Sequence, residues 1–252
     1  MTTSDPAPVP PEFQDSKPVP SQEDLPVLIR DKRTGDIWLV LMIVFFPSLY
    51  YAFADLIWPD LRPARPPVVY SAFSMLVSLA GWAALVVFLI DRSGQPYSRY
   101  GLGRPKWAID LTLGFVLMMI PFQMSGIVYS FTDVIFGSHG ASNWHEFSPR
   151  SPQTAWECVL IGLEMFAVGF VEELVWRGYL MTRIEEVSGS PWKAILLTSV
   201  LFGFNHLYQG PAGVIFTTID GLMYATVFAY TRRLWPVALG HGLLDLILTI
   251  RA

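Results

Sequence analysis

Long apolar runs separated by short polar turns constrain this sequence more than any other feature. Most of the runs are long enough to cross a bilayer as a helix, and a backbone in lipid finds its hydrogen-bond partners only within a helix or a closed barrel. The runs lie at 37–54, 68–90, 109–128, 154–186, 192–208, 212–230 and 236–250. The sequence therefore predicts an all-α fold, a polytopic transmembrane bundle of about seven helices, or eight if one further segment inserts.

Composition favours an integral membrane protein and excludes several other classes. Of the 252 residues, 52% are hydrophobic and 15% are charged, whereas a soluble domain has about 25% charged residues. The net charge of −4 comes mostly from the first 36 residues, which hold seven acids and four bases. The rest is nearly neutral, so we expect no nucleic-acid partner. The single cysteine excludes an intrachain disulfide and a cysteine-rich metal site.

The chain divides into a polar tail and a membrane domain. Seven prolines and several acids lie in the first 29 residues, without the basic and apolar regions of a secretory signal. Such a composition cannot bury enough apolar surface to fold. We therefore expect a disordered, proline-rich tail at 1–35 and a transmembrane domain at 36–252, with a motif-bearing core at about 154–250.

The positions of the bases predict the orientation in the membrane. With seven spans, eleven bases fall on one side and four on the other. The eleven are Arg30, Lys32, Arg33, Arg92, Arg99, Arg104, Lys106, Arg183, Lys193, Arg232 and Arg233. Cytoplasmic loops carry the excess of Lys and Arg. The N-terminus is therefore expected in the cytoplasm and the C-terminus outside, and the bilayer is expected to be the cell membrane.

Two adjacent glutamates and an arginine lie inside the apolar run 154–186. A charge at the bilayer centre costs about 2.5–3.5 kcal/mol, so each of these side chains needs a partner. Glu173 and Arg177 are four residues apart, which favours an ion pair on one helix face. Glu172 points about 100° away from that pair. The sequence thus predicts a supporting Glu173–Arg177 pair and a free Glu172 carboxylate that faces the bundle interior.

Two of the four histidines, His206 and His241, lie in other apolar runs. Asp245 follows His241 by one helical turn, so it can orient and charge-stabilise the imidazole, or the two can share a metal ion with other ligands. Counted at about 1.5 Å per residue, His241 lies nearer to the cytoplasmic surface than His206, so they meet only if the last span starts deeper than 236 or the helices tilt strongly. The other two, His139 and His145, lie in a loop and are expected to be solvated.

Simpler interpretations stand beside these. A single intramembrane histidine is often a residue that hydrogen-bonds one helix to another, and Asp245 lies close enough to the end of its run to reach the interface. Glu164 and Asp220 have no histidine at helical spacing and are interpreted as packing or substrate-path residues. The presence of ionisable groups on three separate spans favours a functional site, because in the membrane such groups find partners only in one another.

Three motifs together resemble those of a known family. The segment EELVWRG at 172–178 matches an EExxxR motif, FGFNH at 202–206 an FxxxH motif, and HGLLD at 241–245 an HxxxN-like motif. In this order they resemble the CAAX protease and bacteriocin-processing (CPBP, or Abi) family of intramembrane endopeptidases. The resemblance covers roughly residues 100–250, and the three motifs jointly are far more specific than any one alone.

The resemblance implies an intramembrane protease whose substrate is a membrane-anchored peptide or protein, such as a prenylated CAAX-type protein or a leader peptide. Glu172 resembles the glutamate that activates water, with His206 beside it, and His241 and Asp245 resemble the pair that stabilises the oxyanion. Asp245 departs from the family, because the best-studied eukaryotic members have Asn there. An ionised carboxylate cannot donate a hydrogen bond, which weakens an oxyanion role and favours metal binding or orientation of His241.

Metal dependence is left open by the sequence. Candidate ligands for a divalent metal such as zinc are Glu172, His206, His241 and Asp245, which would make the chain metalloprotease-like. Because no HExxH motif is present, we favour catalysis by glutamate and histidine with no obligatory cofactor.

Two other functions compete with proteolysis. One is a catalytically silent membrane scaffold of the same family that regulates another membrane protein. The other is a small proton-coupled transporter in which Glu164, Glu172 and Asp220 form the ion path. Transport predicts that Glu164 and Asp220 matter more than the histidines, and proteolysis predicts the reverse. The chain also lacks the internal repeat that is common in transporters.

Overall fold

The structure, a computed structural model, describes residues 25–58, 66–136 and 151–251. Within these ranges the chain is helical and contains no strand. The helices are α1 (Leu25–Val40), α2 (Phe46–Ile57), α3 (Val68–Ser93), α4 (Trp107–Phe136), α6 (Ala155–Glu173), α7 (Thr182–Ser188), α8 (Pro191–Asn205), α9 (Gly210–Thr231) and α10 (Leu234–Arg251). Two π-helical segments, η2 (Leu41–Phe45) and η6 (Leu174–Met181), join α1 to α2 and α6 to α7. Two short 3₁₀ turns are η4 (Tyr97–Tyr100) and η7 (Leu207–Gln209). The predicted all-α membrane bundle is confirmed.

Fewer helices than the seven predicted spans are both long enough and apolar enough to cross a membrane. Each of the seven predicted runs is helical over most of its length, but within the described residues four helices are long and apolar enough to cross a membrane. They extend over 32–54, 68–93, 107–136 and 207–231. Three further helices do not meet this criterion. Helix α10 is apolar but shorter, and α8 has only 15 residues. Helix α6 carries several carboxylates.

The last part of the expected tail is helical. Helix α1 begins at Leu25, so 25–35 are helical and only 1–24 of the expected tail lie outside the described residues. The sequence from 27 to 46 contains no proline, which allows one helix to continue from the polar segment into the apolar one. The expectation for His139 and His145 also falls outside the described residues.

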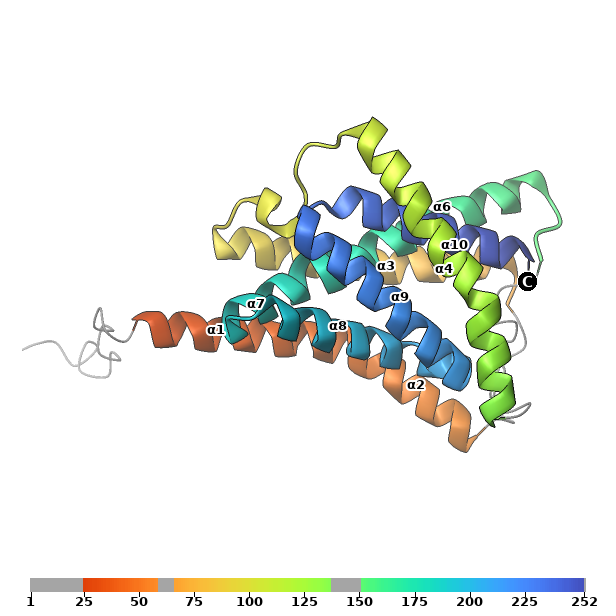
Figure 1. Cartoon of the computed structure of the whole chain (residues 1–252), viewed down its shortest axis with the longest axis horizontal. Coiled ribbons are helices and arrows are strands. Elements are labelled where there is room, and N and C mark those ends of the chain that lie inside the picture. Colours follow the sequence, from red (N-terminus) through yellow and green to blue (C-terminus); the bar gives the residue numbers. More distant parts are fainter. Residues whose placement is uncertain (1–24, 59–65, 137–150, 252) are drawn as a thin grey trace, which may run out of the picture.

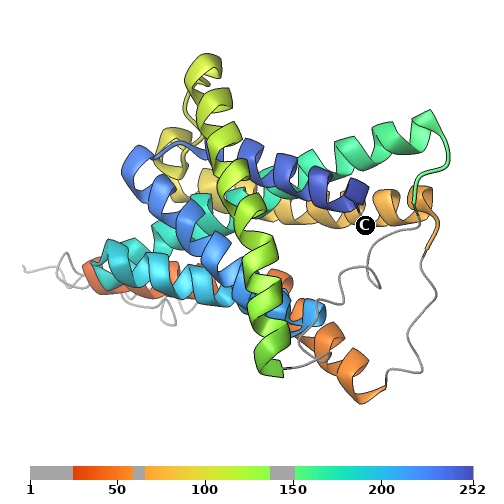
Figure 2. The same cartoon turned by 45° about the vertical axis from the view of Figure 1, so that its right-hand side comes forward.

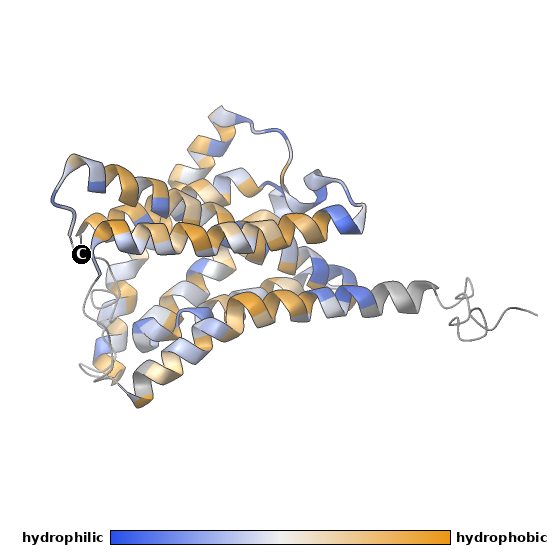
Figure 3. Ribbon diagram, turned by 180° about the vertical axis from the view of Figure 1, so that it is seen from behind, coloured by the Kyte–Doolittle hydropathy of each residue, from blue (hydrophilic) through white to orange (hydrophobic). Residues whose placement is uncertain are grey.

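The helices form two groups, which Figures 1 and 2 show from two directions. Helices α3, α6 and α10 pack side by side, and α8 packs against α9. Helix α4 crosses both α10 and α9 and so joins the two groups (Figure 2). The outer faces of α3 and of α1–α2 are covered with apolar residues (Figure 3). Large exposed side chains there, such as Phe73, Val77 and Met42, suit a lipid environment.

Charged side chains pair at the end of the bundle where α1 begins and α3, α7 and α9 end (Figure 1). Arg233 donates two hydrogen bonds, of 2.8 and 2.6 Å, to the buried carboxylate of Asp110. Glu186 forms ion pairs with three arginines, at distances from 2.8 to 3.4 Å. These are Arg33, Arg99 and Arg183. All four arginines belong to the set that the sequence assigns to the cytoplasmic side, so the fold gathers that set at one end.

Glycines allow α10 to approach α6 closely. A Cβ atom on Gly169 would lie 2.5 Å from the backbone nitrogen of Gly242, closer than real Cβ contacts. A Cβ atom on Gly242 would in turn lie 3.0 Å from the Phe166 ring. Such small-residue contacts are typical of helix packing in membranes. The approach occurs four residues before Glu173 and one residue after His241, so it sets the spacing of the site.

The substitution Gly169→Ala is expected to push α6 and α10 apart and to lower the free energy of unfolding by about 1–3 kcal/mol. Thermal unfolding in detergent measures this loss. The matched control is Gly162→Ala in the same helix, where a Cβ atom meets nothing within 4 Å. Equal stability of the two variants would contradict the close contact.

Candidate active site

One carboxylate oxygen joins two of the sequence motifs. Glu173 Oε1 accepts a hydrogen bond of 2.7 Å from Arg177 Nη1 and lies 2.8 Å from His241 Nδ1. The structure thus contains the ion pair expected from the i,i+4 spacing. It also places His241 of α10 on the same oxygen, which the sequence did not predict. Both Glu173 and Arg177 are buried.

The second ring nitrogen of His241 faces the other two carboxylates. His241 Nε2 lies 3.3 Å from Asp245 Oδ2 and 3.9 Å from Glu172 Oε2. Because a carboxylate oxygen can only accept, the short contacts with Glu173 and Asp245 require that His241 donate from both nitrogens. The imidazole is therefore held between two carboxylates as a doubly donating ring.

Glu172 differs from its neighbour Glu173. It is 9% exposed, whereas Glu173 is fully buried, and Oε1 of Glu173 binds Arg177 and His241. The Oε2 atoms of both glutamates are buried without a hydrogen-bond partner among the described residues. Leaving a buried oxygen unpaired costs about 1–3 kcal/mol. A polar atom of this kind next to an imidazole is a candidate for contact with water or substrate. The sequence prediction of a free carboxylate agrees with this geometry.

His206 follows the last residue of α8 and turns its ring back onto that helix. Its Nδ1 atom lies 2.9 Å from the carbonyl oxygen of Phe202. A carbonyl oxygen only accepts, so Nδ1 carries a proton and Nε2 of the neutral ring is an acceptor. The Phe202 ring packs against His206, with ring centroids 4.7 Å apart.

Phe202 also brings the two histidines to one place. Its ring centroid lies 5.9 Å from that of His241, at 90°, and the Arg177 guanidinium lies 4.3 Å from the same centroid. Both imidazoles therefore flank a single aromatic ring. Helices α8 and α10 both start at the arginine end and run in the same direction (Figure 1), and the contacts of both imidazoles with the Phe202 ring bring the two histidines together.

Asp220 and Tyr224 of α9 belong to the same neighbourhood, although the sequence placed neither at the site. Asp220 is buried, and its Oδ1 atom has no hydrogen-bond partner among the described residues. It is within electrostatic range of His241 and Arg177. The Tyr224 ring stacks on His241 with centroids 5.8 Å apart. Their i,i+4 spacing on α9 was the signal available in the sequence.

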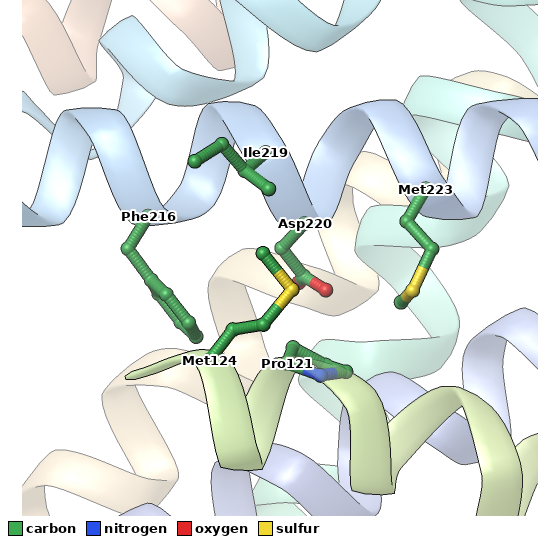
Figure 4. Close-up of a pocket in the computed structure, with 6 residues that line it drawn as sticks. All are labelled: Pro121, Met124, Phe216, Ile219, Asp220 and Met223. Atoms are coloured by element: carbon green, nitrogen blue, oxygen red, sulfur yellow. The ribbon is translucent and has the colours of Figure 1, made fainter. Parts of the chain in front are cut away.

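The Asp220 carboxyl group also lines a pocket between α4 and α9 (Figure 4). The pocket has a volume of about 20 Å³, which is enough for about one water molecule. The other lining residues are Pro121, Met124, Phe216, Ile219 and Met223. Glu164, on α6, is buried too, with Oε2 unpaired among the described residues.

The arrangement of these groups does not fit a metal centre. The described part of the chain holds no group of three or more His, Cys, Asp or Glu side chains that could bind a metal ion. Both nitrogens of His241 already face carboxylates. We therefore derive no chemical step through a metal, and metal dependence stays a question for experiment.

The fold and these contacts define a class: a helical membrane protein in which carboxylates and imidazoles meet inside the bundle. Residues 154–247 match the family model described as "Type II CAAX prenyl endopeptidase Rce1-like". Over these residues the chain is similar to type II CAAX prenyl endopeptidases, and the match supports the CAAX protease (CPBP) family that the three motifs indicate. No curated protein and no solved structure matches the chain.

Removing one partner of the buried ion pair is expected to be strongly destabilising. The substitution Arg177→Met leaves the Glu173 charge buried without its guanidinium, which should lower the free energy of unfolding by about 3–5 kcal/mol. Denaturant unfolding in detergent measures this change. The double variant Glu173→Gln/Arg177→Met should recover part of the loss, because the amide carries no charge. A double variant less stable than Arg177→Met alone would contradict a charge-pair role.

Proposed function

We propose that this chain is an intramembrane endopeptidase in which Glu172 activates the attacking water with the help of His206. The observation that carries the proposal is the unpaired, buried oxygen of Glu172 beside the fixed imidazole of His241. A carboxylate that makes no internal hydrogen bond is available to accept one from water. The family match at 154–247 supports the same reaction class.

Peptide hydrolysis gives each of these groups a defined task. Glu172 takes a proton from water as the hydroxyl oxygen attacks the scissile carbonyl carbon. The Nε2 acceptor of His206 holds the same water in place. When the C–N bond breaks, the proton on Glu172 passes to the leaving amine nitrogen, so Glu172 ends the cycle as a carboxylate.

The His241 cluster supplies positive charge for the oxyanion of the tetrahedral intermediate. An imidazole that donates to both Glu173 and Asp245 is stabilised in its charged form, and a positive charge next to the developing oxyanion lowers the barrier. In this proposal Asp245 takes the place of the family's Asn as a residue that orients and charges His241. It does not act as a hydrogen-bond donor.

The substitution Glu172→Gln is expected to reduce cleavage by at least about 10²–10⁴-fold, because an amide cannot accept the water proton. Turnover is followed with internally quenched peptides, prenylated and unmodified, in detergent or lipid. The wild type is assayed with and without chelator, and loss of activity with chelator would establish a metal requirement.

A matched control is Glu164→Gln, on the same helix. Glu164 and Asp220 both carry buried oxygens without partners among the described residues, which is the observation that favours a proton-coupled transporter. Proteolysis requires that Glu164→Gln retain cleavage while Glu172→Gln does not. A wild type that cleaves none of the peptides while it stays folded would favour a silent scaffold or a transporter.

We further propose that the end bearing the paired arginines faces the cytoplasm, with a membrane-anchored peptide or protein as substrate and the cell membrane as location. The positive-inside rule supports this orientation. The single cysteine, Cys158, is exposed near the start of α6, at the opposite end of the bundle.

On sealed cells, Cys158 is expected to react with a membrane-impermeant maleimide without permeabilisation. Gln153→Cys provides a second position at that end, and Ser98→Cys one at the arginine end, both in a Cys158→Ser background. Ser98→Cys should react only after permeabilisation. The reverse pattern would invert the proposed topology.

A further inference from the structure

A polar pocket lies at the arginine end of the bundle, directly after two of the helices that are long enough to span the membrane. Its volume is about 460 Å³. The lining residues come from η4 and the residues before it, and from the ends of α7 and α9. They are Gln95, Pro96, Ser98, Arg99, Glu185 and Arg232. None of these residues has a task in the proposed hydrolysis.

The pocket lies at the level of the lipid headgroups. The span 68–93 ends two residues before Gln95, and the span 207–231 ends one residue before Arg232. Figure 3 shows that the apolar outer face of α3 gives way to polar residues at this end. Exposed aromatic residues, which are enriched where a membrane meets water, lie at the same end. They are Tyr97, Trp107 and Trp192.

The charges around the pocket do not balance. Glu186 pairs with three arginines, of which Arg99 lines the pocket, and Glu185 pairs with Arg232. Four guanidinium groups thus share two carboxylates, which leaves this network with an excess of positive charge. The carboxylate of Asp91, which precedes the pocket in the chain, accepts a hydrogen bond of 2.6 Å from the Tyr97 hydroxyl. An anionic group in the pocket would reduce the excess.

Both arginines of the pocket keep donors for a ligand. Arg99 donates to Glu186 from Nε, and Arg232 donates to the two oxygens of Glu185 from the single atom Nη2. The remaining guanidinium nitrogens have no hydrogen-bond partner in the part of the chain that the structure describes. The Arg99 and Arg232 side chains are 49% and 38% exposed. A guanidinium that keeps free N–H groups is suited to bind phosphate oxygens.

The backbone fixes the position of Arg232 at the pocket. Its N–H ends α9 by donating to the carbonyl oxygen of Phe228 at 2.8 Å. Its φ of 50° is the one positive φ at a non-glycine residue in the described part of the chain. This left-handed conformation costs about 1–2 kcal/mol for such a residue, and strain of this kind is often found at ligand-binding positions. The pocket therefore holds a cation that is in place before a ligand binds.

We propose that this pocket binds the phosphate group of an anionic phospholipid in the leaflet at the arginine end. Arg99 and Arg232 donate hydrogen bonds to the phosphate oxygens, and Gln95 and Ser98 bond the hydroxyl groups of the headgroup. Basic pockets next to the ends of membrane spans suit anionic lipids. Glu185 holds Arg232 and competes with the phosphate for its guanidinium, so it limits the affinity. The lipid site stands independently of the proposed endopeptidase activity.

The test measures lipid binding by native mass spectrometry of the purified full chain in a nonionic detergent. Phosphatidylglycerol should bind more tightly than phosphatidylcholine, whose headgroup carries no net charge. Arg99→Gln should weaken the binding of phosphatidylglycerol by about fivefold, because a basic residue next to anionic lipid contributes about 1 kcal/mol. Glu186 keeps two other arginines in this variant.

The matched control is Arg104→Gln. Arg104 is an exposed arginine that follows η4, lies outside the pocket and forms no ion pair with the described residues. The two variants lose the same charge at the same end of the bundle. Arg104→Gln should therefore leave the binding of phosphatidylglycerol nearly unchanged.

Glu185→Gln is expected to act in the opposite direction. The amide releases Arg232 from its ion pair and removes a negative charge from the pocket, so phosphatidylglycerol should bind about fivefold more tightly. A general defect in folding cannot produce tighter binding. Thermal unfolding of each variant in the same detergent accompanies the titrations.

Several results would overturn the proposal. Equal binding of the two lipids, or equal losses in Arg99→Gln and Arg104→Gln, would show that binding reflects the general charge of this end and no defined pocket. Weaker binding in Glu185→Gln would contradict the competition for Arg232. Displacement of phosphatidylglycerol by an equal concentration of glycerol phosphate or inorganic phosphate would assign the pocket to a soluble phosphate compound and overturn the lipid.

Discussion

The buried carboxylate of Glu173 is the interaction on which the rest of the structure depends. One oxygen binds both the Arg177 guanidinium and the His241 imidazole, so α6, η6 and α10 meet at a single charged atom. An isolated ion in a medium of low polarity costs several kcal/mol, and that cost is offset only when the geometry satisfies both partners. Any shift of α10 against α6 would therefore leave a charge unpaired.

Packing of small residues makes this contact available. Gly169 and Gly242 let the backbones of α6 and α10 approach until side chains on either side are within hydrogen-bond distance. The eight residues of η6, which follow Glu173, are all buried. Segments of π-helix are rare and often lie at functional sites. This one carries Arg177 towards Gly221 of α9, and so connects the two groups of helices.

The two charged regions of the bundle have different consequences. At the arginine end, Arg99 and Arg33 are partly exposed, and exposed pairs contribute little stability. In the interior, three carboxylates surround one imidazole. Oε2 of Glu172 and Oε2 of Glu173 are both buried without a hydrogen-bond partner in the described chain, but Oε1 of Glu173 is already bonded to Arg177 and His241. Chemistry is therefore expected at Glu172, while the arginine end holds the helices together.

The sequence by itself determined the helical membrane architecture and the local pairs. Apolar runs must become helices in lipid, and one-turn spacing is enough to predict the Glu173–Arg177 pair. Where α1 begins and how His206 and His241 come to the same Phe202 ring could not be read from the sequence, because both depend on where helices begin and how they cross. Only the tertiary structure decided that His241 contacts Glu173 and that the Tyr224 ring of α9 stacks on His241. These contacts join residues far apart in the chain, and helix periodicity carries no information about which faces of two separate helices meet.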